Sequence, residues 1–128
     1  MNRQRTSASG GGVHISPTAI ARVARDAALQ SYGVVGLVDP NIWTVIRHAL
    51  THSDTPGVRV RVRQGRIIVD LYVVVQYGTR ISEVAQGVMN RVKYALEQMV
   101  GVPIAEINVH VQDVRVNHET GSGGGQAA

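Results

Sequence analysis

At 128 residues the chain has room for one domain, and its formal net charge of +4 is too small to indicate nucleic-acid binding by itself. It contains no cysteine, which excludes disulfides and thiolate metal sites and suits a reducing cytosol. No apolar run approaches the ~20 residues of a membrane span, and the N-terminus lacks the apolar region of a signal peptide. We therefore expect a soluble cytoplasmic protein that reaches a membrane only through a partner.

Both ends of the chain are small, polar and rich in glycine. Residues 1–12 and 117–128 cannot bury a core, so we expect two disordered tails. Residues 13–116 remain for a single domain, and about 100 residues are enough for one hydrophobic core without disulfides or metals.

The N-terminal half predicts two helices separated by a loop. The Ser-Pro pair that begins at Ser16 is typical of a helix start, an apolar stripe at helical spacing follows, and Gly33 is placed to end the helix. A short strand at 13–16 precedes this helix. The segment 33–40, "GVVGLVDP", is predicted to be a loop, and 41–50, "IWTVIRHAL" after its capping Asn41, a second short amphipathic helix.

A β-hairpin follows, and its register can be predicted. With Gln64-Gly65 at the tip, Arg63 lies opposite Arg66 and, four pairs further, Arg59 lies opposite Asp70. One face then carries only apolar residues: Val58, Val60, Val62, Ile67, Val69, Leu71, Val73 and Val75. The other face carries Arg59, Arg61, Arg63, Arg66, Ile68, Asp70, Tyr72, Val74 and Gln76.

The C-terminal part predicts a long helix over 81–100, capped by Thr79 and stopped by Gly101, and then a strand from Ile107. Val114 and Val116 break the alternation of that strand, which indicates a bulge or the strand's end. The order of elements predicts an α+β fold, a two-layer sandwich with helices on one face of a small, mainly antiparallel sheet. With the strand at 13–16 the order is βαββαβ; without it, the last strand lies beside the hairpin in a KH-like arrangement.

Three other features favour ordinary structural roles. His48 and His52 have the spacing of a helical metal pair, but a metal site needs further ligands, so two exposed histidines are favoured. Gly33 and Gly36 match the GxxG loop of KH domains, but two valines between them favour a loop packed on the core. No nucleophile stands with a base in a recognisable motif. We therefore expect no catalytic residues, no metal and no cofactor, and a protein that is not an enzyme.

The arginine-rich face of the sheet is the main candidate site. A basic sheet with aromatic residues holds single-stranded RNA in RRM domains, but here Tyr72 is the one aromatic residue on the face, so stacking is missing. A solvated strand protected by charge is the plainer interpretation. The residues predicted to bind a partner are Arg59, Arg61, Arg63, Arg66, Ile68, Tyr72, Val74 and His110.

Four stretches of the chain form a joint pattern: "ISPTAIARVARDAALQSYGVVGLV", "GRIIVDLYVVVQYG", "ISEVAQGVMNRVKYALEQMVG" and "INVHVQDV". In order and spacing they resemble the alkaline-shock-protein family of bacterial envelope-stress proteins. The resemblance implies a non-enzymatic cytosolic protein of envelope homeostasis that self-assembles and is recruited to the membrane by a small membrane-anchored partner. It implies no catalytic residues. The helix at 41–50 departs from the family pattern, so the partner or assembly mode can differ here.

These observations lead to one hypothesis and one alternative. The hypothesis is a non-enzymatic assembly or adaptor protein of the envelope stress response, which binds protein partners, including a second copy of itself, through the basic face. The alternative is a module for RNA or single-stranded nucleic acid that uses the same arginines.

Overall fold

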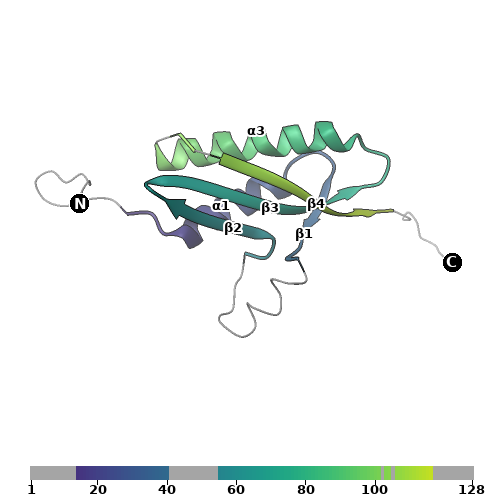
Figure 1. Cartoon of the computed structure of the whole chain (residues 1–128). Helices are drawn as coiled ribbons and strands as arrows, with labels where there is room; N and C mark the ends of the chain where they lie inside the picture. The colour runs from purple at the N-terminus through teal and green to yellow at the C-terminus, as the bar shows by residue number, and fades with distance from the viewer. Residues whose placement is uncertain (1–13, 41–54, 102, 105, 117–128) are drawn as a thin grey trace, which may run out of the picture.

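The structure, a computed structural model, describes residues 14–40, 55–101, 103–104 and 106–116. The predicted tails and the predicted helix at 41–50, with His48 and His52, lie outside these residues. Two helices lie on one face of a four-stranded sheet (Figure 1), so the predicted α+β class is confirmed. The elements are α1 (Pro17–Leu29), β1 (Val34–Leu37), β2 (Val58–Arg63), β3 (Arg66–Gln76), α3 (Ile81–Val100) and β4 (Glu106–Arg115).

Helix α1 starts as predicted but ends earlier. Ser16 is its N-cap, and its hydroxyl accepts a hydrogen bond from the backbone N–H of Ala19 at 3.1 Å. The last helical residue is Leu29, so the prediction that Gly33 ends the helix is wrong. Gly33 does have a left-handed conformation (φ 85°), but it lies in the turn that leads into β1.

Helix α3 has the predicted span and a different N-cap. The N-cap is Arg80, and its side chain makes no capping hydrogen bond. Thr79, the predicted cap, instead donates its hydroxyl to the carbonyl of Gln76 at 2.7 Å and so fixes the turn after β3. Gly101 ends the helix in the left-handed conformation, as predicted (φ 83°).

The β2–β3 hairpin has the predicted register. Each predicted pair is present, from Arg63 opposite Arg66 to Arg59 opposite Asp70. Gln64 and Gly65 both have positive φ, 52° and 75°, which is the two-residue turn whose twist matches the flanking strands. Alternation and turn chemistry therefore fix which side chains face the helices.

Residues 34–37 form strand β1, so the prediction of a loop at 33–40 is wrong in this part. Strand β1 pairs antiparallel with the C-terminal half of β3, with a bulge between Val34 and Gly36. The backbone of Tyr72 donates to Gly57 O at 2.8 Å and accepts from Val38 N at 3.1 Å. In a strand the backbone N–H and C=O of one residue point to the same side. Since Tyr72 bonds to Gly57 and Val38 through these two groups, β1 and β2 lie end to end along one edge of β3.

Strand β4 lies along the other edge of β3, parallel to it (Figure 1). The last strand therefore sits directly beside the hairpin, which is the second of the two predicted arrangements. No strand forms over His14–Ser16, the described part of the strand predicted at 13–16. The predicted irregularity in β4 is confirmed, because the register with β3 shifts after Val73 and leaves Gln112 without a partner in the ladder.

The core lies between the helices and the sheet. Val62, predicted to belong to the apolar face, is 56% exposed, because the helices do not cover the tip of the hairpin. The largest buried side chains of the core are Val69, Leu71, Val73, Val75, Val84, Val88, Val92 and Leu96.

Candidate functional site

The sheet face opposite the helices, which we name the open face, carries the predicted arginines. The register places neighbours from three strands in rows: Arg61, Ile68 and Glu106 form one row. The open face includes, on β2, β3 and β4, the residues Arg59, Arg61, Arg63, Arg66, Ile68, Asp70, Tyr72, Val74, Glu106, Asn108 and His110.

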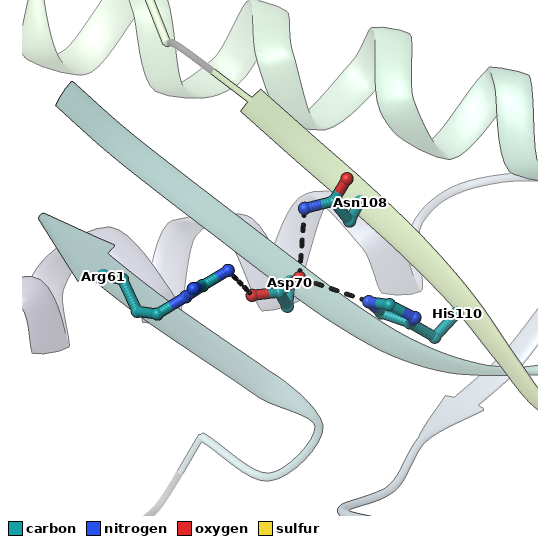
Figure 2. A network of polar contacts seen from close by, with 4 residues as sticks. All are labelled: Arg61, Asp70, Asn108 and His110. Carbon is teal, nitrogen blue, oxygen red and sulfur yellow. Dashed lines mark hydrogen bonds and ion pairs between the residues drawn. The ribbon is translucent and has the colours of Figure 1, made fainter. Parts of the chain in front are cut away.

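A buried carboxylate lies at the centre of the open face (Figure 2). Asp70 is 5% exposed and accepts hydrogen bonds on both oxygens. Its Oδ2 is 3.0 Å from Nη2 of Arg61, and its Oδ1 is 3.1 Å from Nδ2 of Asn108 and 3.2 Å from Nε2 of His110. Since a carboxylate only accepts hydrogen bonds, His110 must carry a proton on Nε2. This Asp70 network joins β2, β3 and β4 through side chains.

The network keeps Asp70 ionised. Burial raises the pKa of Asp70, but hydrogen bonds from His110, Asn108 and Arg61, with the positive charge of Arg61, outweigh burial. The pKa of Asp70 therefore lies below its ordinary value of 3.8. The ion pair with Arg61 runs diagonally across the hairpin, since Ile68 is the residue directly opposite Arg61.

Tyr72 and His110 are stacked beside this network. Their ring centroids are 4.5 Å apart and the ring planes differ by 11°. Burial, and then the negative charge of Asp70, raise the pKa of Tyr72, while Arg59 and Arg61 act in the opposite direction. One face of each ring is thus occupied within the protein, so the aromatic surface available for stacking a base is small.

The arginines of the open face differ in what they contact. Arg61 is bound to Asp70, and its buried Nε has no hydrogen-bond partner among the described residues. Arg63 and Arg66, at the tip of the hairpin, are exposed and form no ion pair within the described part of the chain. The charge of these two guanidinium groups is therefore not neutralised locally.

Seven of the eight residues predicted to bind a partner reach the surface of the open face. Val74 points to the same face but is 1% exposed, so it offers no surface to a partner. Sequence reasoning did not select Asp70 and Asn108 as site residues, although they hold the centre of the face. The signal for Asp70 was a single acid in a mostly apolar strand. For Asn108 no local signal existed, because its role depends on the position of β4.

The open face offers guanidinium, carboxylate, amide and imidazole groups for contact with a ligand. An Asp–His pair activates a neighbouring hydroxyl or thiol in nucleophilic catalysis. Strands β2, β3 and β4 contain no serine, threonine or cysteine to serve as that nucleophile. Across the described ranges, no three His, Cys, Asp or Glu residues are placed to hold a metal ion. None of the described helices is long and apolar enough to cross a membrane.

Comparison with known proteins agrees with the resemblance seen in the sequence. The model of the alkaline-shock-protein (Asp-23) family, described as having a cell envelope-related function, matches residues 5–116. The uncharacterized protein YloU of Bacillus subtilis (strain 168) is 40% identical over 113 residues, which cover 84% of this chain and 92% of YloU. The uncharacterized protein Spy1614 of Streptococcus pyogenes serotype M6 is 33% identical over 111 residues, 83% of this chain and 89% of that protein.

Solved structures add only a distant likeness. A structure of MamM CTD is 19% identical with a TM-score of 0.46, covering 74% of this chain and 94% of its own. The family match spans all of the described residues, and the relatives align over most of their own length. The chain therefore belongs to the alkaline-shock-protein family, whose function is related to the cell envelope.

Proposed function

We propose that this protein is a non-enzymatic adaptor of the cell envelope that binds an acidic protein surface through its open face. The partner is a small membrane-anchored protein or a second copy of the chain, and the adaptor itself stays in the cytoplasm. The family's envelope-related function supports a role at the cell envelope. The face and the chemistry of the partner are argued from the residues.

The observation that carries the proposal is the pair of unneutralised arginines at the hairpin tip. Arg63 and Arg66 are exposed without an acidic partner among the described residues, and Ile68 beside them is half-buried. A partner that brings carboxylates would neutralise both guanidinium groups and cover this apolar side chain at once. The Asp70 network supports the face by tying its three strands together, so little ordering is needed on binding.

A protein partner fits the open face better than a nucleic acid. Binding of single strands without sequence preference depends on aromatic side chains on which bases stack. Tyr72 is the one aromatic residue of β2–β4 other than His110, and these two rings stack on each other. The arginines alone supply affinity that falls steeply with salt.

The test reverses the free charges and leaves the Asp70 network intact. The double variant Arg63→Glu/Arg66→Glu is compared with the control Arg91→Glu/Lys93→Glu, which makes the same charge change on exposed positions of α3. Arg61 is not changed, because its replacement would break the ion pair with Asp70 and disturb the Asp70 network. Tagged protein is recovered from its native cells, co-purifying proteins and RNA are quantified, and the particle mass is measured by light scattering.

We expect the hairpin variant to lose a protein partner or assembly by about tenfold or more, while the control stays near wild type. Equal recovery and equal mass in both variants would remove the open face from the proposal. Recovery of RNA that falls with salt, with a log–log slope of about −1 to −2 for two phosphate contacts, would favour the nucleic-acid alternative.

A further inference from the structure

A hollow of about 530 Å³ lies at the end of the open face. It is lined by Arg63, Gln64, Arg66, Ile68 and Glu106. Its position follows from the register: the first pair between β3 and β4 joins Ile68 to Glu106, so the hairpin tip extends beyond the start of β4. The tip is also not covered by the helices, as the exposure of Val62 shows.

The lining of the hollow combines opposite charges with one apolar side chain. Arg63 and Arg66 lie opposite each other across the hairpin, so their guanidinium groups reach the hollow from the same end. Glu106, which is exposed and forms no ion pair in the described part of the chain, brings one carboxylate to the rim. The half-buried Ile68 supplies the apolar surface between them.

From this arrangement, and building on the proposed function, we infer that the hollow is the subsite for an acidic segment of the protein partner. Two carboxylates of the segment pair with Arg63 and Arg66, and an aliphatic side chain between them covers Ile68. Bidentate contact suits arginine and carboxylate. Glu106 repels negative charge at the rim, so it limits how many acids the subsite accepts and disfavours a continuous polyanion.

The inference is tested with a defined probe, a short peptide of alternating glutamate and leucine, titrated into the full chain and followed by amide chemical shifts. The same peptide with glutamine in place of glutamate is the matched control ligand. We expect the acidic peptide to shift the amides of Gln64, Gly65 and Glu106, and the glutamine peptide to leave them unchanged. Affinity should fall about fivefold or more in Arg63→Gln/Arg66→Gln and stay unchanged in Arg91→Gln/Lys93→Gln.

A gain of affinity provides a second test that a folding defect cannot imitate. Glu106→Gln removes the repelling carboxylate, so the acidic peptide should bind about two- to fivefold more tightly. Equal binding of both peptides, shifts elsewhere on the molecule, or no gain in Glu106→Gln would overturn the inference. So would a short oligouridine that binds the hollow more tightly than the acidic peptide.

The two proposals fail in different ways. If partner recovery depends on Arg63 and Arg66 but the peptide leaves the hollow unchanged, the proposed function stands and the subsite is overturned. If the peptide binds the hollow as described but partner recovery does not depend on these arginines, the hollow is a site for acidic peptides, but the proposed function and the assignment of the hollow to that partner both fail.

Discussion

Replacing Asp70 with asparagine tests whether the Asp70 network stabilises the sheet. The change keeps the shape of the side chain but removes its charge and turns one acceptor into an NH₂ donor. That donor then faces one of three existing donors, from Arg61, Asn108 or His110. The variant should therefore lose a charge-assisted hydrogen bond and the ion pair together.

The expected cost follows from burial. A hydrogen bond to a charged group contributes about 1.5–3 kcal/mol, and unpairing a fully buried ion costs about 3–5 kcal/mol. Asp70 is buried, but the side chains of Arg61 and His110 are 35% and 42% exposed, so water can solvate them once they are released. We therefore expect Asp70→Asn to lower the free energy of unfolding by about 2 kcal/mol, or the Tm by about 8–16 °C.

The assay is chemical denaturation followed by circular dichroism, with Asp113→Asn as control. Asp113 is exposed on β4, so its replacement should change stability by less than about 0.5 kcal/mol. Because the folded-state pKa of Asp70 is lowered, its stabilisation is full above about pH 4 and is lost as the pH falls through the folded pKa. The penalty of Asp70→Asn should shrink in acid; a penalty equal to the control, or constant with pH, would refute the reasoning.

The remaining predictions concern the backbone, a helix cap and a phenol. Gly57→Ala should lower the free energy of unfolding by at least about 2 kcal/mol in chemical denaturation, since φ is +81° and the new Cβ would lie 2.6 Å from the Cβ of Leu37. Gly65→Ala should cost only about 1 kcal/mol, because nothing lies within 4 Å of the new Cβ. Ser16→Ala removes the capping hydrogen bond of α1 and should lower the free energy of unfolding by about 1 kcal/mol in the same measurement. A change at Arg80 should cost less, because its side chain makes no capping hydrogen bond to α3. Burial, then Asp70, raise the pKa of Tyr72 above 10.0, so its stabilisation is lost as the pH rises through the folded value. In an absorbance titration of tyrosine ionisation, Tyr72→Phe should remove the part of the signal that appears above the ordinary tyrosine range; an unchanged titration would contradict this.

The elements with a strong local pattern could be predicted from the sequence. The hairpin register follows from strict alternation of valine and arginine around a two-residue Gln-Gly turn, and a one-residue slip would bury the arginines. Strand β1 could not be predicted in the same way, because it has four residues, a glycine and a bulge. Its pairing with β3 joins residues about 40 positions apart, such as Val34 and Val75, and nothing local specifies such a contact.

The candidate site was predictable in its outline and not in its centre. The register alone places the arginines on the open face. Asp70 meets Asn108 and His110 only because β4 runs parallel to β3 with Asp70 beside Asn108 and Tyr72 beside His110. The sequence left the position of the last strand open, so the Asp70 network and the ring stack could not be derived from it.

The end-to-end arrangement of β1 and β2 has a consequence for protein engineering. The chain leaves the sheet at Val38 and re-enters it at Gly57 at one point, since these two residues both bond to the backbone of Tyr72. Asp39 accepts a hydrogen bond from the N–H of Gly57, which joins the two ends directly, and Arg25 of α1 donates to the carbonyl of Pro56, which holds one end on the helix. The entropic cost of closing a loop rises only slowly with loop length, so a longer segment between these ends costs little stability. This position is therefore suited to displaying a foreign peptide or inserting a reporter domain without changing the strand register.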